Sequence, residues 1–304
     1  MFSGSFTITP QGPFSLAEAA MFGFGQRDEP GWDGCMRLAF CLDGYEQQVG
    51  AEVRQAGSPD TGPADVHVVF RSPADVDAGL VRQQVARVLS LDYDGAEFLR
   101  VGERDPVIGR LQAAAPGLRP PLFYSPYEAA VWSVLSARRP QRQMMQVRDR
   151  LNAAHGVVFD LAGVRLAALP APAQLLRVES FPGISEDKLH RLHGVARAAL
   201  EGQLDVGLLQ ELGPERAMAG LQSIKGIGPF YSALIVIRAA GFRDVLPVSE
   251  PRALALAARL YQLPGPPSEA EFRALAEVWR PFRTWAVVLI RAAARRILAD
   301  EPAA

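Results

Sequence analysis

The chain has 304 residues, enough for about two domains and a substantial hydrophobic core. Hydrophobic residues make up 49% of it and charged residues 21%, with a formal net charge of −1, as in an ordinary globular protein. This charge balance gives no support to a strongly basic nucleic-acid binder, although a local basic cluster can bind nucleic acid at any net charge.

Several other classes are excluded by simple patterns. Apolar runs such as 233–237 are far shorter than the roughly 20 residues of a membrane span, and no basic region followed by an apolar core opens the chain. We therefore expect a cytoplasmic protein with no membrane partner. Cys35 and Cys41 match neither a disulfide framework nor a metal cluster, and His190 and His193 lack a third ligand at zinc spacing.

The first part of the chain has the patterns of strands with a few helices. Alternating apolar residues predict strands in the segments "FTIT", "MRLAFCL" and "DVHVVF", which all lie between residues 6 and 70. Helices are predicted near Leu16–Gly23 and Val76–Leu91. The Pro-rich stretch Ala115–Pro126 is the candidate boundary. The prediction is an α+β N-terminal domain over 1–115, with an antiparallel sheet.

The rest of the chain, 116–304, is predicted to be an all-α domain. Its apolar residues follow helical periodicity between short breakers. The predicted helices are Tyr127–Ala137, Gln141–Ala154, Ala173–Arg177, Ser185–Glu201, Val206–Leu212, Pro214–Ser223, Pro229–Gly241, Pro251–Tyr261, Glu269–Trp279 and Thr284–Ala299.

Between two of these helices lies the segment "LQSIKGIGPFYSALIVI" (Leu221–Ile237). Gly226 and Gly228 allow a tight turn and a close approach of another molecule, and Ile227 between them can fix the turn on the two helices. Pro229 is suited to the first position of the second helix. The first N–H groups of that helix then point outward as an anion-binding end.

The charges around this hairpin are all positive, namely Lys225, Arg238 and Arg243. Positive side chains beside an open helix end can bind a phosphate without reading base sequence. The alternative is an ordinary glycine-containing turn between two helices.

A single acid follows in the segment "DVLPVSEPRAL" (Asp244–Leu254). Glu250 precedes Pro251, so its backbone is predicted to be non-helical and to cap the next helix, whose positive end favours an ionised carboxylate. The alternative is a helix-terminal acid without chemistry. Glutamate is a poor capping residue, however, and Ser249 could serve instead.

The segment "LQSIKGIGPFYSALIVIRAAGFRDVLPVSEPRAL" resembles the core of the helix-hairpin-helix DNA glycosylase superfamily, in which such a hairpin is followed by an essential aspartate. Gly228 and Glu250 are 22 residues apart, a spacing that fits this pattern. The segments "ITPQGPFSLAEAAMFGF", "GLRPPLFYSPYEAAVWSVLS" and "WRPFRTWAVVLIRAA" resemble the branch of 3-methyladenine DNA glycosylase II. The resemblance thus covers nearly the whole chain and implies this fold.

The resemblance implies a catalytic role for Glu250, which replaces the aspartate of the family and moves the carboxylate by about 1 Å. A carboxylate there would stabilise the sugar cation formed when a flipped base leaves. The base pocket is implied at Phe22, Phe230, Leu234 and Arg291. Aromatic rings would favour a cationic base. Leu234 and Arg291 depart from the aromatic residues of the family, and Arg291 would repel a cationic base unless paired.

DNA contacts are implied at two places. Arg138 falls at the position that fills the gap left by the flipped base, with Arg139 beside it. The alternative for these two residues is a solvated basic helix start. The hairpin contributes Lys225 and Gly226, Ile227 and Gly228.

The resemblance also bears on cofactors and reaction type. The carbonyls of Gln222, Ile224 and Gly226 match positions that bind a monovalent cation in the family, and no other cofactor is required. Phe230 stands where bifunctional relatives have a lysine nucleophile, which implies a monofunctional enzyme that uses water. The expected partner is damaged double-stranded DNA, bound by a monomer without a nucleotide cofactor.

These features lead to one main prediction and two alternatives. The main prediction is a DNA glycosylase of base excision repair that removes alkylated, 3-methyladenine-like purines. The first alternative is a protein of the same fold that binds damaged or distorted DNA without excision. The second is a hairpin that mediates protein contacts only.

Overall fold

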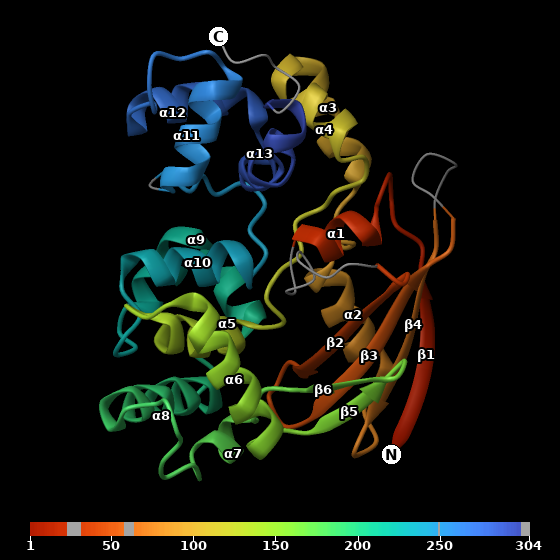
Figure 1. Cartoon of the computed structure of the whole chain (residues 1–304), viewed down its shortest axis with the longest axis vertical. Coiled ribbons are helices and arrows are strands. Elements are labelled where there is room, and N and C mark those ends of the chain that lie inside the picture. Colours follow the sequence, from red (N-terminus) through yellow and green to blue (C-terminus); the bar gives the residue numbers. More distant parts are fainter. Residues whose placement is uncertain (23–31, 58–63, 249, 299–304) are drawn as a thin grey trace.

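The computed structural model describes residues 1–22, 32–57, 64–248 and 250–298 (Figure 1). Its first part is a four-stranded antiparallel sheet in the order β1-β4-β3-β2. The strands are β1 (Phe2–Ile8), β2 (Cys35–Cys41), β3 (Gln48–Gln55) and β4 (Val66–Ser72).

The strands follow the apolar alternation where one face of the sheet is buried. In β4, Val66, Val68 and Phe70 are buried, while His67 and Val69 between them are exposed. The strand β3 was not predicted, because its residues are buried on both faces and show no alternation.

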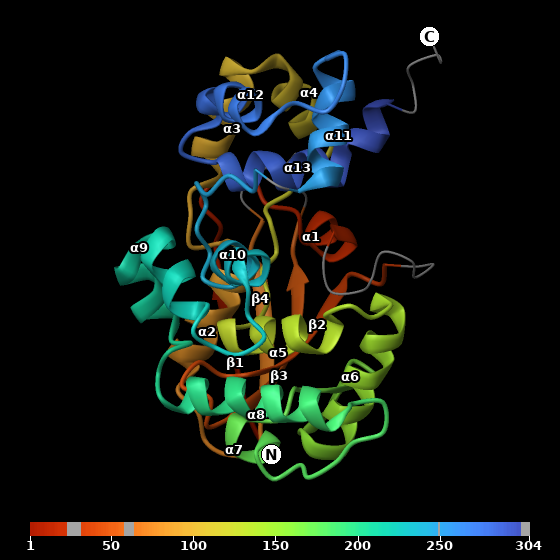
Figure 2. The same cartoon turned by 90° about the vertical axis from the view of Figure 1, so that its left-hand side faces the viewer.

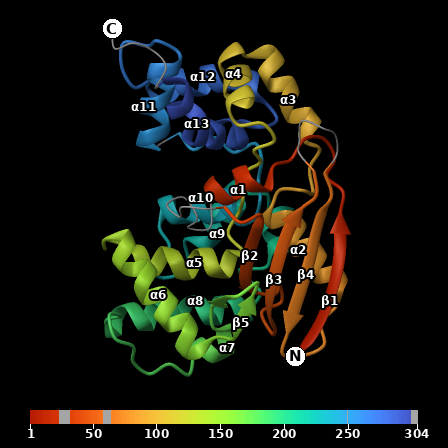
Figure 3. The same ribbon diagram turned by 45° about the vertical axis from the view of Figure 1, so that its right-hand side comes forward.

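The two faces of the sheet are covered by different elements (Figure 3). Helices α1 (Leu16–Phe22) and α2 (Ala78–Val88) share a hydrophobic core with the sheet, and α2 is capped by Asp77. On the other face lies a hairpin of β5 (Val158–Leu161) and β6 (Val164–Ala167), whose Phe159 packs closely against Gly50. This hairpin is a difference from the predicted all-helical second part, and its short strands are fixed by the sheet they cover.

One group of helices surrounds a core that includes Tyr127, Leu192 and Ile235 (Figure 2). Within it, α5 packs against both α8 and α10, and α10 also packs against α9. The helices of this group are α5 (Pro126–Ser136), α6 (Gln141–His155), α7 (Pro172–Leu175), α8 (Glu186–Leu200), α9 (Val206–Leu221) and α10 (Pro229–Arg238). Gly213 and Pro214 break α9 in two, as the sequence predicted, because Gly213 has a positive φ of 75°.

A second group of helices has its own core, built around Trp279, Phe282 and Trp285. Its helices are α3 (Gly95–Arg104), α4 (Pro106–Ala114), α11 (Pro251–Leu260), α12 (Glu269–Leu275), a 3-10 helix (Ala276–Trp279) and α13 (Arg283–Leu298). Helices α3 and α4 were not predicted from the sequence, and they lie far from their partner α13 along the chain.

The predicted order, a sheet with helices followed by a helical part, is confirmed. The segment between α10 and α11 passes from the first helical group to the second, and Glu250 lies at its end (Figure 1). Helix α1 lies beside the same junction. Over the described residues, the structure contains no helix with the length and apolar character of a membrane span.

Candidate active site and nucleic-acid interface

The segment between α9 and α10 forms a tight hairpin. Ile224 and Ile227 are buried, and the Ile227 N–H donates to the Ile224 carbonyl over 2.9 Å. Gly226 has a φ of 102°, which only glycine adopts readily. Gly228 caps α10, and a side chain added there would meet no other group. The isoleucines thus hold the turn from inside, and the space beside Gly228 is open.

The start of α10 offers backbone donors. The first N–H that closes a helical turn is that of Ser232, which donates to the Gly228 carbonyl. The N–H groups of Gly228, Phe230 and Tyr231 have no acceptor among the described residues. Free N–H groups and the positive end of the helix dipole form an anion-binding site.

The predicted basic segment lies close to the hairpin. Gly226 approaches Val134, which is on α5 two residues before that helix ends. The chain then turns at Arg138, whose φ is 56°, and both Arg138 and Arg139 are exposed. The helix end that carries these arginines and the glycine turn therefore belong to one side of the molecule.

Two further basic residues, Lys188 and Arg191 on α8, belong to this surface and were missed in the sequence analysis. Lys188 donates to the carbonyls of Leu135 and Ala137 at the end of α5, and Arg191 lies beside Gly226. Burial, and then the charges of Arg139 and Arg191, lower the pKa of Lys188. Lys188 and Arg191 are three residues apart on a predicted helix, and this spacing could have indicated that they lie on the same face of it.

Glu250 caps α11, as the sequence predicted. Its backbone is extended, and its Oε2 accepts the Ala253 N–H over 2.6 Å. The other oxygen, Oε1, lies 3.6 Å from Nη1 of Arg291 on α13. The carboxylate is 21% exposed, so it lies against the protein and is still accessible. Ser249, the alternative cap, lies outside the described residues.

The segment before Glu250 is fixed by another acid, Asp244. Its carboxylate accepts from Arg280 and Arg283 at 2.9–3.0 Å, and also from the Arg283 N–H. Thr284 donates its hydroxyl to the Val245 carbonyl and accepts the Val245 N–H. These bonds tie the segment to the start of α13, whose later turn carries Arg291.

Phe22 ends α1 and is buried in the same core as Leu246 and Ala253. The guanidinium of Arg238 lies 5.4 Å from the centre of its ring. The structure thus brings Phe22 to the segment that carries Glu250.

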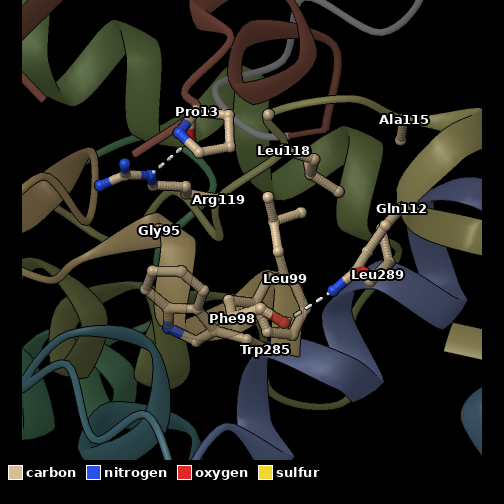
Figure 4. A pocket seen from close by; sticks show the side chains of 11 residues that line it. Pro13, Gly95, Phe98, Leu99, Gln112, Ala115, Leu118, Arg119, Trp285 and Leu289 are labelled. Atoms are coloured by element: carbon tan, nitrogen blue, oxygen red, sulfur yellow. Dashed lines mark hydrogen bonds between the residues drawn. The ribbon is translucent and has the colours of Figure 1, made fainter. Parts of the chain in front are cut away.

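The approach to α1 is held by Arg119, which is buried and was not singled out in the sequence. Its guanidinium donates to the carbonyl of Pro13 (Figure 4). It also donates to the carbonyls of Ser90 and Tyr93. Burial lowers the pKa of Arg119 to about 10, although the charges of Asp94 and Asp92 act in the opposite direction. The cavity beside it has room for about one water molecule, 10 Å³, so it is a packing feature.

The other two predicted pocket residues lie on α10. Phe230 is 62% exposed and makes an edge contact with Tyr231, and Leu234 is half-buried. The structure therefore brings together Glu250 and Arg291, with Phe22 in the adjoining core, and leaves Phe230 on the surface.

The three carbonyls proposed for a monovalent cation lie at the hairpin. Those of Gln222 and Gly226 accept no hydrogen bond from the described residues, and that of Ile224 keeps a second lone pair beside its bond from Ile227. The donor set is compatible with such an ion. No group of three histidine, cysteine or acidic side chains suited to a metal occurs in the described part of the chain.

No protein-family model matches the chain. It is 30% identical over 206 residues to the "Probable bifunctional transcriptional activator/DNA repair enzyme AlkA" of Mycobacterium tuberculosis, a match that covers 66% of this chain and 40% of the relative. It is also 30% identical over 191 residues to DNA-3-methyladenine glycosylase 2 of Escherichia coli, covering 60% and 63%. The chain therefore spans less than two thirds of each relative.

Solved structures share the fold. The 3-methyladenine DNA glycosylase of Archaeoglobus fulgidus superposes with a TM-score of 0.74 at 19% identity, covering 96% of this chain and 99% of that one. The 3-methyladenine DNA glycosylase of Schizosaccharomyces pombe, in complex with abasic DNA, gives 0.51 at 21% identity, covering 67% and 98%. Sequence and fold agree in what the chain resembles: it is similar in sequence to DNA-3-methyladenine glycosylases and shares its fold with solved 3-methyladenine DNA glycosylases.

Proposed function

We propose that the protein is a monofunctional DNA N-glycosylase of base excision repair that removes alkylated purines, of which 3-methyladenine is the type. The observation that carries the proposal is the carboxylate of Glu250, held at the start of α11 with Arg291 nearby and with no hydrogen bond between Oε1 and a described residue. The relatives named for repair of 3-methyladenine support the substrate class.

We expect damaged double-stranded DNA to contact the surface that carries the hairpin and the exposed arginines after α5. The open N–H groups at the start of α10 and the side chain of Lys225 would hold a phosphate. A monovalent cation held by the hairpin carbonyls would add positive charge toward the same phosphate. Arg138, exposed on its turn, would fill the gap left by the flipped base.

The proposed reaction breaks the bond between C1′ of the sugar and N9 of the purine. The electron pair of that bond leaves with the base, and positive charge develops on the sugar. Glu250 would stabilise this charge and accept a proton from the water that attacks C1′. Water thereby supplies the hydroxyl of the abasic site. Phe230 replaces the lysine of bifunctional relatives, which supports hydrolysis over a Schiff-base route.

The test is release of free base from a methylated duplex. The wild-type protein is expected to release 3-methyladenine, and Glu250→Gln to slow single-turnover release by about 100-fold or more. Gln can still accept the Ala253 N–H, so the variant should fold. Equal release by the two proteins would show that another group does the chemistry.

The alternative, binding without excision, has its own outcome in this assay. Tight and lesion-selective binding with no base release by the wild-type protein would support it and contradict the enzyme. We further propose that the protein acts in the cytoplasm as a monomer, which gel filtration can check.

A further inference from the structure

Helix α8 packs along α5 and brings its second turn to the glycine hairpin (Figure 2). Arg191 lies on that turn, and its Cδ atom is among the atoms nearest to Gly226. The side chain of Arg191 is 39% exposed, so it covers the glycine and still reaches the surface. The hairpin and α8 therefore contribute to one surface of the protein.

The guanidinium of Arg191 has a single acidic partner among the described residues. Its Nη2 lies 2.9 Å from Oδ2 of Asp187, one helical turn earlier, and the side chain of Asp187 is 63% exposed. The Nε of Arg191 has no hydrogen-bond partner. Because an exposed ion pair of this kind contributes little free energy, another anion can replace the Asp187 carboxylate.

The positive charges around Arg191 outnumber this acid. Lys188 lies on the same helix and donates to the carbonyls at the end of α5, and Arg139 follows that end in the chain. Burial, and then the charges of the two arginines, lower the pKa of Lys188, so the three positive groups are close enough to repel one another. An anion bound beside them would relieve that repulsion.

A DNA strand supplies such anions in series. Each strand carries a phosphate about every 3.4 Å along the axis of the duplex. A strand whose phosphate is held at the start of α10 therefore presents neighbouring phosphates to the side chains beside the hairpin. The planar fork of a guanidinium can donate to two oxygens of one phosphate, which gives a stronger contact than an exposed pair with a carboxylate.

We propose that Arg191 binds a DNA phosphate next to the one held by the hairpin, and that Asp187 competes with the DNA for its guanidinium. In the free protein Arg191 pairs with Asp187. In the complex a phosphate takes the place of the carboxylate, which is then hydrated. Asp187 thus weakens DNA binding through Arg191. This inference rests on the proposed contact between the hairpin and DNA, and it adds α8 to that contact.

The experiment measures binding of a labelled duplex that contains one stable abasic-site analogue, by fluorescence anisotropy at about 50 to 200 mM salt. The variants are Arg191→Gln, Arg191→Lys, Asp187→Asn and the double variant of Arg191→Gln with Asp187→Asn. The matched controls are Arg197→Gln and Glu186→Gln. These two residues of α8 are exposed and form no ion pair with a described residue. Thermal unfolding checks that each variant is folded.

We expect Arg191→Gln to weaken binding by about tenfold at low salt and to reduce the slope of log Kd against log salt by about 0.9, the value for one phosphate contact. Arg191→Lys should keep most of the slope, because it keeps the charge. Asp187→Asn should tighten binding about threefold when Arg191 is present and have little effect in the double variant. Arg197→Gln and Glu186→Gln should change binding little.

Two results would overturn the inference: an unchanged salt slope in Arg191→Gln, or an equal gain from Asp187→Asn with and without Arg191. Release of base from a methylated duplex is measured on the same proteins as a separate readout. Base release with an unchanged slope would leave the glycosylase proposal standing. The expected changes in binding without base release would support the role of Arg191 and contradict the enzyme. A wild-type protein that neither binds the duplex nor releases base would overturn both.

Discussion

Asp244 and Glu250 lie six residues apart before α11, and both face arginines of α13, but their surroundings differ. The Asp244 carboxylate takes hydrogen bonds from Arg280 and from the backbone and side chain of Arg283. Glu250 takes one, from Ala253, and stands 3.6 Å from its arginine.

The difference shows how a protein separates structural acids from reactive ones. An acid whose lone pairs are all satisfied by the protein has none left for a ligand, and it stabilises the fold. An acid held by a single bond keeps an oxygen for another partner. By this criterion Asp244 positions the segment and Glu250 is the candidate for chemistry.

The largest effect on stability is expected when Asp244 is removed. Asp244→Ala leaves Arg283, only 15% exposed, without its acid, and should lower the free energy of unfolding by about 2 kcal/mol. Urea or thermal unfolding measures it. The matched control is Glu277→Ala, which removes the other acid of Arg280 at a largely exposed pair and should change stability little. Equal losses in the two variants would contradict the structural role of Asp244.

A third acid, Glu128, makes the stability of the fold depend on pH. Glu128 on α5 accepts one backbone N–H, from Cys41, and burial raises its pKa from 4.5 to about 8. Between pH 4.5 and about pH 8, the carboxyl group is therefore still protonated in the folded state and already ionised in the unfolded state. This contribution to stability is complete below pH 4.5 and is lost as the pH rises to about 8.

We therefore expect the unfolding free energy to fall between pH 5 and pH 8 by at most about 1.4 kcal/mol per pH unit from this group. The measurement is urea unfolding across that range. Glu128→Gln should flatten the dependence. An unchanged pH profile in this variant would show that Glu128 is already ionised in the folded protein.

The smallest effect on stability is expected at the pair of Glu250 and Arg291. Arg291→Gln should change the free energy of unfolding by no more than about 0.5 kcal/mol, because a long and partly exposed ion pair contributes little. Chemical denaturation of the variant and the wild-type protein tests this. A loss as large as that of Asp244→Ala would mean that both acids are structural.

Much of the fold could be predicted from the sequence. Helical periodicity placed the helices from Tyr127 to the C-terminal region, and the glycine and proline spacing predicted the turn between α9 and α10. Gly226 indeed has the positive φ that the turn requires. Two kinds of element were not predicted. The strand β3 is buried on both faces and has no alternation, and α3 packs against helices that are distant in the sequence.

The division at residues 115 and 116 stays a prediction. Helices α3 and α4 precede that point, yet their core is shared with α11 and α13 from the other end of the chain. A change in composition shows where the chain becomes Pro-rich. It does not predict which distant helices a segment packs against.

By itself, the sequence determined the local features of this protein: the glycine turn, the proline that starts α10, and the extended backbone that makes Glu250 a helix cap. These follow from the φ and ψ angles that a few residues allow. Only the tertiary structure decided that Arg291 faces Glu250, that Arg238 covers Phe22, and that Lys188 and Arg191 join the basic side. Those pairings depend on how distant helices pack, and the spacing along one helix does not specify them.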